Sequence, residues 1–118
     1  MKWGDCHSEW FEIFAGVRQG GVLSPDLYSI YVDDLIKKLI LLGKGCYFAR
    51  MFAAALFYAD DMALLAPSIK GLQCLLNACE TYCAEWDICL NPKKSKNLYF
   101  GKRTESLFKV TLKGSEIQ

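Results

Sequence analysis

Residues 57–66 read FYADDMALLA and place two adjacent carboxylates, Asp60 and Asp61, inside one of the most apolar runs of the chain. Apolar residues continue on both sides of the pair, up to a stop at Pro67. Two short buried strands joined by a tight turn at the aspartates fit this pattern best, because Asp tolerates turn conformations. The alanine-rich residues 53–55 would suit a helix equally well on propensity alone. We therefore expect a β-hairpin with carboxylates at its tip.

A helix is expected on each side of this hairpin. Ser24 and Pro25 suit an N-cap and a first helical position, and apolar residues then recur every four positions up to Gly43. Ser68 suits the cap of a second helix, whose apolar face extends to Trp86. The order of elements predicts an α+β fold in which two helices cover a mostly antiparallel sheet. The remaining strands are expected at residues 8–16, 95–101 and 106–114.

Length and composition favour one small folded domain. The chain has 118 residues, of which 53% are hydrophobic, and a formal net charge of +1. No apolar run reaches the roughly 20 residues that a membrane span needs, and no signal-type segment begins the chain, so we expect an intracellular protein, nuclear or cytoplasmic, without a membrane partner. Basic residues crowd the last third, where a phosphate backbone would bind: Lys93, Lys94, Lys96, Lys102 and Arg103.

The cysteines and the single histidine exclude several kinds of site. The six cysteines form no CxxC pair and no Cys/His cluster with zinc-site spacing, so we interpret them as small reduced core residues. His7 is the only histidine, which leaves Ser-His and Cys-His nucleophile schemes without support.

A second aspartate pair, in YVDDL at residues 31–35, resembles the first but has a different setting. Within the expected helix, Asp33 and Asp34 point about 100° apart and cannot converge on one ion. Each has a lysine four residues later, Lys37 and Lys38 respectively, in the order that favours exposed helix pairs. We interpret this pair as a solvated helix face.

Asp60 and Asp61, in contrast, have no lysine or arginine within eight residues on either side. Such a pair at a hairpin tip needs a partner from elsewhere, and carboxylate oxygens suit Mg²⁺, which keeps waters and substrate phosphates as its other ligands. An ordinary exposed turn, where Asp is common, is the alternative. Spacing alone does not decide between the two.

Three segments in this order, GVRQGGVLSPDLYSIYVDDL, FYADD and NPKKS, resemble the palm of reverse transcriptases, above all the non-LTR (LINE-like) retrotransposon type. The resemblance covers residues 1–118 and implies one partial palm domain, with a catalytic hairpin packed against two helices. It also implies that Asp60 is the main metal ligand and Asp61 a supporting one. Two Mg²⁺ ions, or Mn²⁺ in their place, would activate the primer 3′-hydroxyl and stabilise the leaving pyrophosphate.

The same resemblance implies a nucleotide- and template-binding set. One segment would line the pocket for the incoming nucleotide and the template base, Tyr58 would lie at the primer side, and a lysine of NPKKS would approach the nucleotide phosphates. YVDDL then falls within the helix of the pocket segment, and its likeness to the catalytic box is accidental. The implied residues are Arg18, Gln19, Gly20, Gly21, Ser24, Pro25, Tyr58, Asn91 and Lys94.

The chain departs from the family pattern upstream of RQGG. A palm polymerase needs a further aspartate on a strand there, whereas only Asp5 precedes Arg18, and WGDCHS does not fit that strand. From the resemblance we also expect fingers and thumb segments to lie outside residues 1–118, where they or another chain would cover apolar surface left bare. The parent enzyme would use an RNA template, a DNA primer and deoxynucleoside triphosphates. We expect this chain alone to be inactive as a polymerase.

Two other interpretations compete with this one. The first is a degenerate or domesticated remnant that binds nucleic acid or a protein without catalysis, through the basic residues from Lys93 to Arg103 and the bare apolar surface. The second is a palm of a viral RNA-copying enzyme. Such enzymes usually have glycine before the aspartate pair, where this chain has Ala59.

Overall fold

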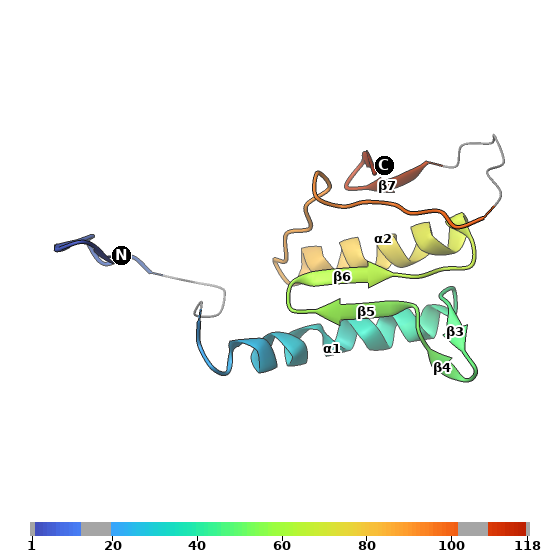
Figure 1. Cartoon of the computed structure of the whole chain (residues 1–118), viewed down its shortest axis with the longest axis horizontal. Coiled ribbons are helices and arrows are strands. Elements are labelled where there is room, and N and C mark those ends of the chain that lie inside the picture. The colour runs from blue at the N-terminus through green and yellow to red at the C-terminus, as the bar shows by residue number, and fades with distance from the viewer. Residues whose placement is uncertain (1, 13–19, 102–108, 118) are drawn as a thin grey trace.

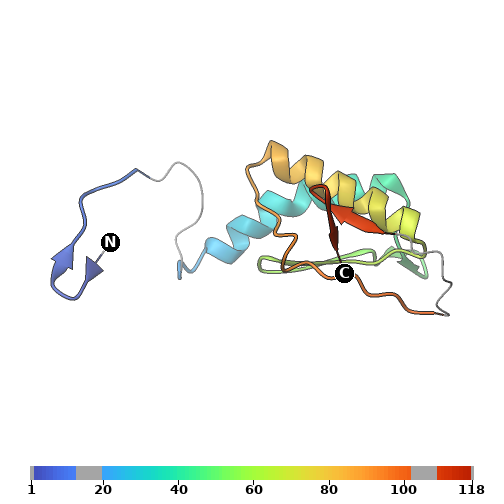
Figure 2. The same ribbon diagram turned by 90° about the horizontal axis from the view of Figure 1, so that it is seen from above.

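The computed structural model describes residues 2–12, 20–101 and 109–117, and the fold is given for these ranges. Both helices lie on one side of the β5–β6 hairpin, while β1 and β2 lie apart from this body (Figures 1 and 2). The elements in chain order are β1 (Lys2–Trp3), β2 (Cys6–His7), α1 (Ser24–Leu42), β3 (Tyr47–Phe48), β4 (Met51–Phe52), β5 (Ala55–Tyr58), β6 (Asp61–Leu64), α2 (Ile69–Glu85), β7 (Val110–Leu112) and β8 (Ser115–Ile117).

The first helix, α1, has the expected end and a start shifted by one residue. Gly43 adopts a left-handed conformation with φ of 60°, and its N–H donates to the Ile40 carbonyl at 3.1 Å, which ends the helix. Leu23, not Ser24, occupies the N-cap position, and no side chain caps this end. Pro25 lies in the first turn, where its missing N–H costs no helical hydrogen bond.

The β5–β6 hairpin is confirmed, and residues 53–55 are not helical. The strands pair antiparallel, with Ala55 opposite Leu64 and Tyr58 opposite Asp61. Alternate residues point to opposite faces, so one face carries apolar side chains that pack on the helices. These inward residues are Ala55, Phe57, Met62 and Leu64.

The second helix, α2, begins as predicted. The Ser68 hydroxyl accepts a hydrogen bond from the Gly71 N–H at 3.1 Å, which satisfies one of the free donors of the first turn. The apolar residues that recur every three or four positions form its buried face. These are Leu75, Leu76, Cys79, Tyr82 and Cys83.

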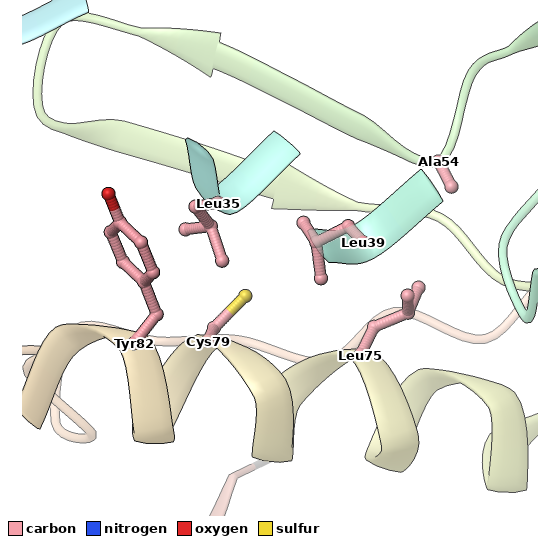
Figure 3. Close-up of a cluster of buried hydrophobic side chains, with 6 residues drawn as sticks. All are labelled: Leu35, Leu39, Ala54, Leu75, Cys79 and Tyr82. Atoms are coloured by element: carbon pink, nitrogen blue, oxygen red, sulfur yellow. The ribbon is translucent and has the colours of Figure 1, made fainter. Parts of the chain in front are cut away.

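The main core forms where α1 and α2 face each other beneath the hairpin. Figure 3 shows Leu35 and Leu39 of α1 opposite Leu75, Cys79 and Tyr82 of α2, with Ala54 beside them. The Cys79 thiol lies 3.7 Å from the sulfur of Met62 on β6 and so joins α2 to the hairpin. Full burial of each leucine stabilises the fold by about 1.5–3 kcal/mol. The hairpin packs against this same cluster and is thereby held against the helices.

Gly45 is required by close packing next to this core. A Cβ at this position would lie 1.9 Å from the Cβ of Ala54, which is fully buried. Only glycine permits this approach of the α1–β3 connection to the residue that precedes β5.

The sheet differs from the expected one. The strands form four separate two-stranded antiparallel sheets, β1–β2, β3–β4, β5–β6 and β7–β8, within the described ranges. Each sheet pairs two strands that are consecutive in the sequence, as a tight turn between antiparallel strands allows. The α+β class and the hairpin packed on two helices are confirmed, whereas one continuous sheet is absent from the residues that the structure describes.

Two of the remaining strand predictions are wrong over their described residues, and the third is confirmed in part. Residues 8–12 form no strand, and 13–16 lie outside the described residues. Residues 95–101 also form no strand: their aromatic composition suits one, but they join none of the described sheets. Within 106–114, β7 forms at Val110–Leu112, and residues 106–108 lie outside the described ranges. The β3–β4 and β7–β8 hairpins were not predicted.

The cysteines are free thiols, but only some belong to the core. Cys79 and Cys83 are buried, and Cys46 and Cys74 are half-buried. Cys6 and Cys89 are exposed, so the core interpretation is wrong for these two. Among the described helices, neither combines the length and apolar character needed to cross a membrane.

Candidate functional site

Asp60 and Asp61 occupy the exposed tip of the β5–β6 hairpin. Tyr58 ends β5, Ala59 and Asp60 form the two-residue turn, and Asp61 begins β6. Tyr58 is 84% exposed and, like Asp61, points away from the buried face. The hydrogen-bonded ladder of β5 and β6 fixes the backbone on both sides of the turn, and so it fixes where the two carboxylates leave the backbone.

The turn contains an unusual backbone conformation at Ala59. Its φ of 51° lies in the left-handed region that glycine adopts without penalty. A positive φ at the first central residue matches the twist of two-residue hairpins, which explains why the chain accepts it. The tip of the hairpin therefore stores conformational strain next to the aspartates, of about 1–2 kcal/mol for a residue with a Cβ.

The surroundings of the tip are electrostatically uncompensated. Neither Asp60 nor Asp61 forms an ion pair with any residue in the described ranges. From α1, Tyr28 comes near enough that the Asp60 charge contributes to a raised pKa of the Tyr28 hydroxyl, after burial and the charge of Cys83. Sequence reasoning missed Tyr28, although it precedes the buried Val32 by one helical turn, a spacing that indicated the same face.

Two carboxylates at the tip could serve as ligands to a metal ion. Nowhere in the described part of the chain do three or more His, Cys, Asp or Glu side chains gather in a way that could hold an ion. The oxygen donors of Asp60 and Asp61 suit Mg²⁺, which takes one or two protein carboxylates together with water and phosphate oxygens. The donor set fits such an ion when substrate phosphates supply further ligands.

The segment that the resemblance assigns to the nucleotide pocket is only partly described. Arg18 and Gln19 lie outside the described residues. Gly20 is exposed with φ of 76°, and the Gly21 carbonyl accepts a hydrogen bond from the Ser24 N–H at 3.2 Å. Ser24 and Pro25 belong to the first turn of α1. Figure 1 shows this start of α1 at the same end of the body as the β5–β6 turn.

Asn91 and Lys94 lie in a turn that follows α2. The Asn91 carbonyl accepts hydrogen bonds from the N–H groups of Lys94 and Ser95 at 3.2 and 3.1 Å. The Asn91 side-chain oxygen accepts from the Lys93 N–H at 3.0 Å. Asn91 therefore builds the turn, and the Lys94 side chain is left exposed.

An aromatic contact fixes α1 to the end of α2 at this side of the molecule. The Tyr82 hydroxyl donates to the Tyr31 carbonyl at 2.7 Å, and the Tyr31 hydroxyl donates to the Trp86 carbonyl at 2.8 Å. The Trp86 ring packs edge-on to Tyr31 and stacks on Tyr82, with centroids 5.0 and 5.8 Å away. These contacts hold the helices on which the hairpin rests.

The second aspartate pair lies on an exposed face of α1. Lys37 contacts both carboxylates, Asp33 at 2.7 Å and Asp34 at 3.0 Å. The predicted pairing of Asp34 with Lys38 is wrong, because Lys38 points toward α2 and binds Glu85 at 2.9 Å. Both side chains of each ion pair are at least half exposed, so each pair stabilises the fold by about 0.2–1 kcal/mol.

Comparison with known proteins shows consistent similarities. The family described as "Reverse transcriptase (RNA-dependent DNA polymerase)" matches residues 2–113. An "RNA-directed DNA polymerase from mobile element jockey" of Drosophila funebris is 33% identical over 93% of this chain and 12% of its own length. A "Probable RNA-directed DNA polymerase from transposon BS" of Drosophila melanogaster is 37% identical over 78% of this chain and 10% of its own.

A third relative is the "Retrovirus-related Pol polyprotein from type-1 retrotransposable element R2" of Nasonia vitripennis, 34% identical over 75% of this chain and 9% of its own. The chain thus spans about a tenth of the length of these curated relatives. No solved structure matches the chain with comparable significance.

Proposed function

Because the chain belongs to the reverse transcriptase family, we propose that its 118 residues form part of the palm of an RNA-directed DNA polymerase of the non-LTR retrotransposon type. The parent reaction extends a primer 3′-hydroxyl on an RNA template with deoxynucleoside triphosphates, in the nucleus or cytoplasm. One observation carries the proposal: Asp60 and Asp61 lie at an exposed hairpin tip without a cationic partner among the described residues.

The hairpin supplies carboxylates to divalent cations. Asp60 acts as the main ligand and Asp61 as a supporting one, and the β5–β6 ladder keeps both at a fixed height beside the primer end. When bound, two Mg²⁺ ions, or Mn²⁺ in their place, favour the deprotonated 3′-hydroxyl and stabilise charge on the leaving pyrophosphate.

The proposed substrate-binding residues have distinct roles. The glycines at 20 and 21 let the backbone approach the incoming nucleotide, since they lack a Cβ. Lys94, exposed on the Asn91 turn, contacts nucleotide phosphates. Arg18, Gln19, Ser24 and Pro25 complete the pocket for nucleotide and template base, and Tyr58 contacts the primer side.

The 118-residue polypeptide by itself represents a single partial palm domain. We propose that it does not polymerise, because two-metal chemistry needs a further carboxylate and none joins Asp60 and Asp61 among the described residues. Fingers and thumb segments, or another chain, would hold the RNA template and DNA primer over the hairpin.

Metal binding is tested by titrating Mn²⁺ into the isotope-labelled chain and recording paramagnetic broadening in NMR spectra. Broadening confined to residues near 58–62 is expected, and Asp60→Asn should remove it. Asp33→Asn on the exposed face of α1 is the matched control and should leave it unchanged. Broadening that centres on Asp33, or that survives Asp60→Asn together with Asp61→Asn, would contradict the proposal.

Primer extension tests the predicted inactivity. The polypeptide is incubated with primed RNA, deoxynucleotides and either Mg²⁺ or Mn²⁺, and we expect no extended primer. Template-dependent product that Asp60→Asn abolishes would show that these 118 residues suffice for polymerisation.

A non-catalytic, nucleic-acid-binding role is the second candidate. The favouring observation is that Lys93, Lys94 and Lys96 are exposed and form no ion pair with a described residue. Salt-dependent binding of primer–template that persists in Asp60→Asn without divalent metal would favour this role over a metal-centred one.

A further inference from the structure

The β3–β4 hairpin presents aromatic and cationic side chains that the proposed catalytic end does not use. Phe48 pairs with Met51, and the two side chains are 73% and 66% exposed. Tyr47 pairs with Phe52 on the other face, where the rings contact edge-on with centroids 5.5 Å apart. Because Phe52 packs against the main core, it anchors the hairpin and leaves Phe48 and Met51 facing outward.

This end of the molecule has an excess of positive charge. From Leu35 to Ala59 the sequence contains no carboxylate. Of the cations in this stretch, Lys37 and Lys38 are paired, whereas Lys44 and Arg50 form no ion pair within the described ranges.

The exposed Lys70 adds to this charge, since the first turn of α2 packs against Lys44: a Cβ on Gly71 would lie 2.8 Å from the Lys44 carbonyl oxygen. That first turn has no acidic residue. Three cations without a paired carboxylate in the described ranges therefore lie in or next to the segments that carry this exposed aromatic ring.

The β3–β4 hairpin lies away from the aspartates. Figure 1 shows it at the end of the body opposite the β5–β6 turn. A ligand at this hairpin would therefore not occupy the metal-binding tip, and its binding can be measured separately.

We propose that the β3–β4 hairpin binds single-stranded nucleic acid outside the catalytic end, with a base stacked on Phe48 and the phosphate backbone at Arg50, Lys44 and Lys70. Base stacking on aromatic rings is sequence-tolerant and needs an exposed ring next to cations, which this hairpin provides. Charge favours a polyanion over a protein partner with an apolar surface alone. The proposal rests on the proposed function in nucleic-acid synthesis, but binding at this hairpin requires neither metal nor catalysis.

The test is fluorescence anisotropy of the 118-residue chain with a labelled 20-nucleotide oligo(dT) strand, without divalent metal and at several salt concentrations. Phe48→Ala should weaken binding by about fivefold to a hundredfold, as for other base-stacking rings. Arg50→Ala should reduce the salt dependence by the share of one phosphate contact, a slope change of about 0.7. Phe11→Ala removes an exposed ring on the distant N-terminal segment and should leave affinity unchanged.

Stacking is separated from charge by an abasic strand of equal length and charge. The unmodified chain should prefer the strand that carries bases, and Phe48→Ala should lose most of that preference. Circular dichroism confirms that the variants keep their helices. Equal binding by the unmodified chain, Phe48→Ala and Arg50→Ala would overturn the proposal, and a loss of self-association in Phe48→Ala would then assign the hairpin to a protein interface.

Discussion

The side-chain amide of Gln73 on α2 forms two hydrogen bonds with the backbone of Thr111 on β7. Its Nε2 donates to the Thr111 carbonyl at 2.9 Å, and its Oε1 accepts from the Thr111 N–H at 2.9 Å. About two turns further along α2, the Glu80 carboxylate accepts a hydrogen bond from the Lys113 N–H. Side chains of α2 thus take the place of a neighbouring strand along β7 and attach the β7–β8 hairpin to the body.

Gln73→Ala should therefore release β7. Loss of two partly solvated hydrogen bonds is expected to lower the free energy of unfolding by about 1 kcal/mol. Urea unfolding measures this change, and hydrogen exchange should show lower protection of the Thr111 amide. Lys70→Ala, at an exposed site of the same helix, is the control and should change neither quantity. Unaltered exchange at Thr111 in Gln73→Ala would contradict the assignment.

Stability should fall in alkaline solution because of Cys79. Burial raises the pKa of the Cys79 thiol from 9.0 to about 12, with Cys83 and Glu80 acting in the same direction. The unfolded chain then releases this proton near pH 9 while the folded chain keeps it, so stability decreases as pH rises from about 9 toward 12.

The expected loss from the Cys79 thiol between pH 8 and 10 is about 1 kcal/mol. Urea unfolding at both pH values measures it. Cys79→Ala lowers stability at both pH values through the cavity that it leaves, but the difference between them should shrink. An unchanged difference would show that other groups cause the pH dependence.

The strained turn of the β5–β6 hairpin predicts a stabilising substitution. Ala59→Gly relieves the positive φ at the cost of a more flexible unfolded chain, for a net gain of about 0.5–1 kcal/mol. Ala63→Gly, at an exposed position within β6, is the matched control and should destabilise by about 0.5–1 kcal/mol. Thermal unfolding of both variants checks the opposite signs. A destabilised Ala59→Gly would mean that the turn is not strained.

Lys38 should couple to α2 and not to its helical neighbour. A double-mutant cycle of Lys38→Met with Glu85→Gln is expected to give a coupling energy of about 0.2–1 kcal/mol, lower at high salt. The same cycle with Asp34→Asn should give a value near zero, since Asp34 binds Lys37. Urea unfolding of the single and double variants measures both energies, and a larger coupling to Asp34 would refute the observed pairing.

Local signals account for what the sequence predicted well. The recurrence of apolar residues every three or four positions, with Gly43 and Ser68 at helix ends, locates both helices within one residue at the ends that were predicted. The paired strands around Asp60 follow from apolar runs on both sides of a turn. Each of these features depends on residues close together in the sequence, so propensity and capping decide them.

Contacts between distant residues required the tertiary structure. The approach of Tyr28 to Asp60 depends on how α1 lies against the hairpin, and Lys38 binds Glu85 because the two helices pack side by side. Residues 95–101 have strand-like composition without becoming a strand, since none of the four described sheets includes them.

The sequence by itself determined the two helices, the hairpin with its two aspartates and the family. Only the tertiary structure decided which charges are paired, which aromatic rings stay exposed and which strands find partners. The physical reason is that burial and pairing free energies depend on the relative placement of elements, which no local pattern specifies.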